Sequence, residues 1–100
     1  MAQDENLYTT HPDIVVLYAA AWCPDCDRVR SVIEQSGVEF LEVDVAKDAR
    51  AGEFLEKLLR RVRLPTIFFP DGGMSVEPSN EEVARHLPHR SASSRNLPGD

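Results

Sequence analysis

The chain has 100 residues, which is enough for one domain whose single hydrophobic core needs no disulfide or metal for stability. Hydrophobic residues make up 42% and charged residues 28% of the sequence, as is typical of folded globular proteins and not of disordered or fibrous ones. The formal charge of −6 at pH 7 argues against nucleic acid or an anionic membrane as a partner.

Residues 1–13 are polar and lack a regular hydrophobic pattern. They have neither the basic start nor the apolar stretch of a secretory signal, and no apolar run of the chain approaches the roughly 20 residues of a membrane helix. His11 precedes Pro12, which favours an extended chain because helical geometry is disfavoured before a proline. We therefore expect residues 1–13 to form a flexible lead-in, the protein to be cytoplasmic, and membranes not to be among its partners.

The next part of the chain predicts a strand, a helix and a second strand. Residues 14–18 form a short run of β-branched and aromatic side chains, typical of a strand buried on both faces. Residues 24–36 predict a helix, because apolar residues recur at helical spacing, Pro24 suits the first turn and Gly37 suits the end. Residues 38–45 predict the second strand, which a right-handed crossover would place parallel to the first.

The second half predicts a helix, a hairpin and a last helix. Residues 49–61 carry apolar side chains at helical spacing on one face. Residues 66–69 and the strand after the turn at residues 70–73 predict a β-hairpin. The sequence S-N-E-E, which begins at Ser79, is typical of a capping box that starts a helix, and this helix is expected to end near Leu87.

Together these elements predict one α/β domain over residues 14–87. Its four-stranded mixed sheet, built from a βαβ unit followed by α-β-β-α, should be flanked by helices on both faces. Residues 88–100 are rich in Ser, Arg, Pro and Gly and offer little apolar surface, so we expect a disordered C-terminal tail.

Two cysteines stand in the motif W-C-P-D-C at the start of the predicted helix. Thiols of the cytosol are kept reduced, so a pair such as Cys23 and Cys26 is more often catalytic or metal-binding than structural. Three positions apart in a first helical turn, the two can form a reversible disulfide. Cys23 falls at the N-cap, where free amides and the helix dipole favour a thiolate. We therefore predict that Cys23 is the nucleophile and Cys26 the resolving thiol.

Asp25 lies between the cysteines and complicates this prediction. Its charge would oppose a thiolate on Cys23 by about 0.7 kcal/mol in water at a separation of about 6 Å. Arg28 and Arg30 follow on the same helix and could offset the charge, but the sequence does not fix the direction of their side chains. We expect Asp25→Ala to make Cys23 easier to ionise.

The motif W-C-P-D-C after a buried strand, R-L-P-T-I-F-F about forty residues later, D-G-G and a capped last helix resemble the glutaredoxin-like oxidoreductases of the thioredoxin fold. The compact order of elements is similar to small bacterial members such as mycoredoxins. The resemblance implies that Pro65 is cis beside the reactive sulfur and that Leu64 pairs its backbone with the substrate. The residues expected around a substrate are Trp22, Pro24, Asp25, Arg63, Leu64, Pro65 and Ser79.

Three of these positions keep a second interpretation. Trp22 could simply pack in the core. The run R-R-V-R at residues 60–63 could bind a carboxylate of a small thiol or an acidic partner, or could be a solvated helix end. The amides at Ser79 and Asn80 could hold a substrate carboxylate, but self-capping explains Ser79 equally well.

The resemblance implies a thiol–disulfide oxidoreductase that reduces protein disulfides or mixed disulfides between proteins and small thiols. We expect a monomer with no bound cofactor, reduced by a small thiol of the glutathione or mycothiol type, or by thioredoxin reductase with NADPH. Glutaredoxins often carry a Lys shortly before the first cysteine and a Tyr within the motif. This chain has three alanines and Asp25 at those places, which weakens the case for glutathione.

Three alternatives remain open. A zinc site could use Cys23, Cys26, His86 and His89, although the spacing is not that of a zinc finger. An iron–sulfur cluster could bridge two protomers through Cys23 and a small thiol. A thioredoxin-fold binding module with redox-inactive cysteines is the third alternative.

Overall fold

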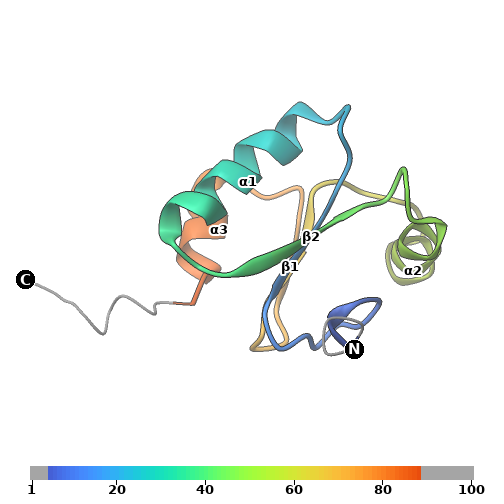
Figure 1. Ribbon diagram of the computed structural model, residues 1–100, viewed down its shortest axis with the longest axis horizontal. Helices are drawn as coiled ribbons and strands as arrows, with labels where there is room; N and C mark the ends of the chain where they lie inside the picture. The colour runs from blue at the N-terminus through green and yellow to red at the C-terminus, as the bar shows by residue number, and fades with distance from the viewer. Residues whose placement is uncertain (1–4, 89–100) are drawn as a thin grey trace, which may run out of the picture.

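A four-stranded mixed sheet lies at the centre of the computed structural model, which describes residues 5–88 (Figure 1). The strand order is β2-β1-β3-β4, and β1 is parallel to β2 and antiparallel to β3. β3 and β4 form the predicted antiparallel hairpin. The strands are β1 (Val15–Ala19), β2 (Phe40–Asp44), β3 (Thr66–Phe68) and β4 (Met74–Val76). The predicted mixed sheet and its parallel βαβ unit are therefore confirmed.

Helices cover both faces of this sheet, as expected. They are α1 (Pro24–Ser36), α2 (Ala49–Leu59) and α3 (Asn80–His86). Figure 1 shows α1 and α3 side by side and α2 apart from them. The prediction carried the second helix to residue 61, but α2 ends at Leu59 because Arg60 adopts the left-handed conformation, with φ of 75°. This turn directs the chain into the loop before β3.

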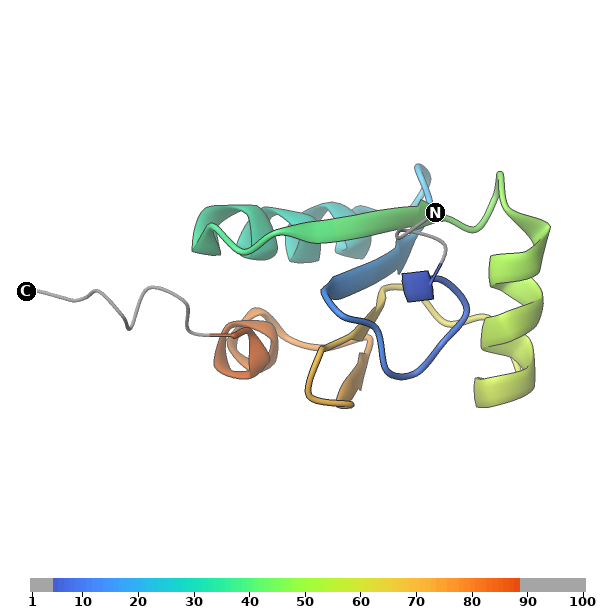
Figure 2. The ribbon, with the colours of Figure 1, turned by 60° about the horizontal axis from the view of Figure 1, so that its bottom comes forward.

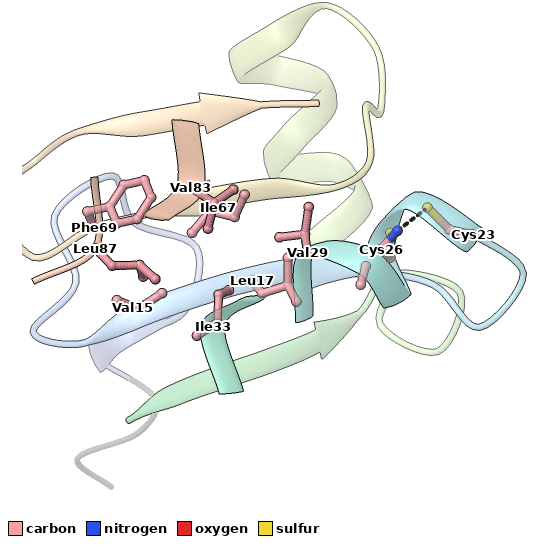
Figure 3. Close-up of a cluster of buried hydrophobic side chains, with 11 residues drawn as sticks. Val15, Leu17, Cys23, Cys26, Val29, Ile33, Ile67, Phe69, Val83 and Leu87 are labelled. Atoms are coloured by element: carbon pink, nitrogen blue, oxygen red, sulfur yellow. Dashed lines mark hydrogen bonds between the residues drawn. The ribbon is translucent and has the colours of Figure 1, made fainter. Parts of the chain in front are cut away.

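The side chains of β1 alternate between two hydrophobic clusters, which explains the unbroken apolar run of this strand. Val15, Leu17 and Ala19 contact a cluster that also holds both cysteines (Figure 3). The other members of this cluster come mainly from α1, β3 and α3: Val29, Ile33, Ile67, Phe69, Val83 and Leu87. Val16 and Tyr18 face the other way, into a cluster that includes Ala51 and Leu55 of α2. The predicted strand buried on both faces is confirmed.

The N-terminal segment packs on the side of the sheet that faces α2 (Figure 2). The Tyr8 hydroxyl donates to Asp48 at 2.6 Å, and the Tyr8 amide donates to the buried Tyr18 hydroxyl at 3.0 Å. Asn6 is buried, and its Oδ1 accepts from the Asp13 amide at 2.6 Å. The expectation of a flexible lead-in over residues 1–13 did not anticipate these contacts.

Both predicted end segments lie partly or almost wholly outside the described residues. Residues 1–4 of the lead-in are not described, and Pro88 is the one described residue of the predicted tail 88–100. Between residues 5 and 88, no helix has the length and apolar character needed to cross a membrane.

Candidate active site

Cys23 is the N-cap residue of α1, at the end of the sheet where β1 leads into the helix. Its backbone is extended, with φ of −107° and ψ of 103°, and Pro24 occupies the first helical turn. The Cys26 amide donates to Cys23 Sγ at 3.2 Å, which Figure 3 marks with a dashed line. This sulfur therefore takes the place that a serine or aspartate oxygen usually takes at a helix N-cap.

The two sulfurs are free thiols in unequal surroundings. Cys23 is 7% exposed, whereas Cys26 is completely buried in the first hydrophobic cluster. Burial, together with a hydrogen bond to the Cys23 side chain, raises the pKa of Cys26 to about 12. Cys26 consequently keeps its proton at neutral pH. This asymmetry fits the roles predicted for a nucleophile and a resolving thiol.

The loop before β3 packs against the cluster that contains both cysteines. The Leu64–Pro65 peptide bond is cis, as the resemblance implied. Pro65 is buried, its carbonyl accepts from the Glu77 amide at 2.8 Å, and Leu64 packs against the cluster that contains both cysteines. The Thr66 hydroxyl donates to the Arg63 carbonyl at 2.6 Å and fixes the turn into β3.

Trp22 projects into solvent next to the nearly buried Cys23. Its exposed fraction is 70%, the highest among the large hydrophobic side chains described as exposed. The interpretation of Trp22 as a core residue is therefore wrong. Pro24 and Asp25 are also exposed, so all three lie where a substrate bound to Cys23 could contact them.

The arginines of α1 take different directions. Arg28 Nη2 lies 3.5 Å from Asp25 Oδ1, and Arg28 Nη1 donates to Asn80 Oδ1 at 2.6 Å. Arg30 instead donates to Glu42 and Asp27. Sequence reasoning did not identify Asn80 as the partner of Arg28, and no local signal pointed to it, because the two residues are 52 positions apart.

Ser79 forms the predicted capping box of α3. Its hydroxyl accepts from the Glu82 amide at 3.1 Å, and its own amide donates to Glu82 Oε1 at 2.9 Å. The bond from the Ser79 amide lowers the pKa of Glu82. Self-capping thus accounts for Ser79, because both of its polar groups already have a partner within the helix.

The run at residues 60–63 lies at the surface beside the cis-proline loop. Arg60 and Arg61 are exposed and Arg63 is half-buried. In the part of the chain that the structure describes, none of these three arginines has a side-chain hydrogen bond or an ion pair. They are available to a carboxylate, and they are equally compatible with a solvated helix end.

The residues of the alternative zinc site do not come together where they are described. His86 stacks on Phe69, with ring centroids 3.9 Å apart, and its Nε2 lies 3.6 Å from Asp71 Oδ1. Over residues 5–88, no group of three or more His, Cys, Asp or Glu side chains could hold a metal ion. His89, the fourth proposed ligand, lies outside the described residues.

Comparisons with known proteins agree on one family. Residues 15–73 match the family model named Glutaredoxin. A protein of Mycobacterium tuberculosis (strain H37Rv) that carries the name glutaredoxin is 30% identical over 74 residues, which cover 73% of this chain and 88% of that protein. A glutaredoxin of Pseudomonas aeruginosa is 45% identical over 29 residues, which cover 29% of this chain and 34% of that protein.

Solved structures show the same fold. The crystal structure of the thioredoxin-like protein BC3987 is 27% identical with a TM-score of 0.65, and the match covers 73% of this chain and 99% of that one. The glutaredoxin-like protein NrdH-redoxin from Escherichia coli is 20% identical with a TM-score of 0.64, and the match covers 74% of this chain and 95% of that one. These matches confirm the α/β, thioredoxin-like fold.

Proposed function

This chain belongs to the glutaredoxin family, and we propose that it is a thiol–disulfide oxidoreductase that works through the dithiol of Cys23 and Cys26. The observation that carries this proposal is the unequal pair of free thiols at the α1 N-terminus. Cys23 Sγ accepts a hydrogen bond from the Cys26 amide at the start of the helix. The Cys26 thiol is buried and has a raised pKa. A structural disulfide or a redox-inactive pair would not need this difference.

Cys23 performs the first step. Its sulfur, as a thiolate, attacks one sulfur of the substrate disulfide, and the substrate S–S bond breaks as the new mixed disulfide forms. The other substrate sulfur leaves as a thiolate with both bonding electrons. The Cys26 amide at 3.2 Å and the positive end of the helix dipole stabilise the negative charge on Cys23 before the attack.

Cys26 performs the second step. Its high pKa keeps it protonated, so it does not compete for the incoming disulfide. Once Cys23 is in the mixed disulfide, the Cys26 sulfur attacks Cys23 Sγ, and its proton passes to the departing substrate sulfur. Substrate leaves reduced by two electrons, and the protein holds a Cys23–Cys26 disulfide.

The surroundings of Cys23 support disulfides of proteins, or mixed disulfides of proteins with small thiols, as substrates. Exposed Trp22 and Pro24 offer an apolar surface beside Cys23, and half-buried Leu64 packs against the cluster that holds both cysteines. We propose that a small thiol of the glutathione or mycothiol type, or thioredoxin reductase with NADPH, returns the oxidised pair to the dithiol. We further propose that the protein is a cytoplasmic monomer.

Single replacements of the cysteines test the proposed function by the steady-state rate of reduction of a protein disulfide. Cys23→Ser should lower the rate by about 100-fold or more, because the attacking sulfur is lost. Cys26→Ser should allow the first attack but slow the release of reduced protein substrate. A Cys23→Ser variant with the rate of the unmodified protein would contradict the assignment of the nucleophile.

A further inference from the structure

Among the described residues, the Asp25 carboxylate of the W-C-P-D-C motif has one cation within ion-pair distance. Asp25 lies in the first turn of α1, two positions after Cys23, which is the N-cap residue of the same helix. Arg28 Nη2 lies 3.5 Å from Asp25 Oδ1. Long side chains of a helix point toward its N-terminus, which brings the Arg28 guanidinium to the level of Asp25. Both side chains are on the surface, so their attraction alone would fix neither of them.

A second set of contacts fixes the guanidinium. Arg28 Nη1 donates to Asn80 Oδ1 at 2.6 Å, and Nη2 donates to the Pro78 carbonyl at 3.2 Å. Pro78 lies in the segment that leads into α3, Asn80 is the first residue of α3, and this helix packs beside α1. The cation is therefore anchored on the α3 side of α1, and Asp25 is drawn to that side.

We propose that Arg28 is a positioning residue for Cys23: it holds the Asp25 carboxylate on the α3 side of the α1 N-terminus and so preserves the thiolate form of the Cys23 sulfur. The benefit for catalysis rests on the proposed function, in which Cys23 attacks as a thiolate. Without Arg28, the carboxylate is free to turn toward the sulfur and oppose its negative charge.

No other described cation takes this place. Arg30, the other arginine of α1, forms ion pairs with Asp27 and Glu42. Within residues 5–88, Arg28 is the one cation within ion-pair distance of Asp25. The other charged groups from the elements around this end of the sheet are Asp44, Arg60, Arg61, Arg63, Glu77, Glu81 and Glu82.

The test is the rate of Cys23 alkylation in the reduced full-length protein as a function of pH, quantified on the Cys23 peptide by mass spectrometry. Arg28→Gln should raise the pH of half-maximal rate by about half a unit. The separate variant Arg28→Lys should keep the midpoint of the original protein, because lysine can still pair with Asp25. In the Asp25→Asn background, Arg28→Gln should no longer shift the midpoint. Alkylation requires no disulfide substrate, so failure here is distinct from failure of the proposed function.

Arg30→Gln is the matched control, since it removes a cation of the same helix that does not contact Asp25; its midpoint should stay in place. The proposal is overturned if folded Arg28→Gln keeps the original midpoint, or if the shift persists in the Asp25→Asn background. Thermal unfolding establishes that each variant is folded. Should Arg28→Gln fail to fold, Arg28→Met removes the cation but keeps the apolar stem of the side chain, and an unchanged midpoint there would equally overturn the proposal.

Discussion

Cys26 lies in the hydrophobic cluster between β1, α1 and α3. It is completely buried, and its pKa is raised to about 12, first by burial and then by its bond to Cys23. A thiol with this pKa is almost entirely protonated near neutrality, and alkylating reagents react with thiolates. The reactivity of the Cys26 thiol toward reagents in solution should therefore be low while Cys23 is a free thiol.

This arrangement predicts selective alkylation of the native dithiol. At about pH 8, iodoacetamide should modify Cys23 at least about tenfold faster than Cys26, as measured by peptide mass spectrometry. In denaturant the two cysteines should react at similar rates, because burial of Cys26 is then lost. Equal rates in the folded protein would contradict the environment described for Cys26.

The placement of the candidate site residues could be predicted from the sequence because it depends on local structure. Cys23, Pro24 and Cys26 are set by one helix start, and the cis Pro65 followed from the resemblance of the motif around it. The anchoring of Arg28 by Asn80 was beyond prediction, because it depends on the packing of two helices far apart in sequence.

Among the elements, α3 is a short helix that depends on its cap. The helix spans Asn80–His86, and Ser79 and Glu82 form a reciprocal pair of hydrogen bonds at its start. A helix of two turns is unstable alone, so this cap and the packing of Val83 hold it against α1. The loss of either hydrogen bond should therefore be detectable in the stability of the whole domain.

The cap predicts a specific dependence of stability on pH. The pKa of Glu82 is lowered in the folded protein, so an unfolded chain binds a proton first as the pH falls below about 4.3. The free energy of unfolding should therefore fall as the pH drops through this range, and Glu82→Gln should reduce that fall.

Ser79→Ala should lower the free energy of unfolding by about 1 kcal/mol at neutral pH, as measured by denaturant unfolding.

Glu81→Gln provides the control for the predicted pH dependence. Glu81 lies in the same first turn of α3 and is exposed, but it has no part in the capping box. Its replacement should leave the pH dependence near that of the unmodified protein. If Glu81→Gln and Glu82→Gln change the pH dependence equally, general charge and not the cap is responsible.

Element types followed from the sequence more closely than element ends. The capping box and Gly37, with φ of 78°, mark their helix boundaries by local chemistry, and both boundaries agree with the prediction. The end of α2 was missed because a left-handed arginine at position 60 carries no signal comparable to a glycine.

On the scale of the whole molecule, β1 connects every layer. One side of the strand faces the cluster of α1, α3 and both cysteines, and the other faces α2. The Tyr18 hydroxyl, on the side of α2, accepts a hydrogen bond from the Tyr8 amide. This bond connects the N-terminal segment to the strand that leads into the site. The sheet and its two faces were predictable from hydrophobic patterns. The contacts of Tyr8 were not predictable, because its hydroxyl donates a hydrogen bond to Asp48, which is 40 positions away in the sequence.

We propose that Cys23 attacks a disulfide and that Cys26 resolves the product, and trapping the mixed disulfide is the decisive experiment. Cys26→Ser, mixed with a disulfide-containing protein and analysed by intact mass without reductant, should accumulate a covalent adduct on Cys23 that added dithiothreitol removes. Cys23→Ser is the matched control and should accumulate none, since Cys26 is buried and protonated. An adduct on Cys23→Ser in place of Cys26→Ser, or on neither variant, would contradict the assignment of Cys23 as the nucleophile.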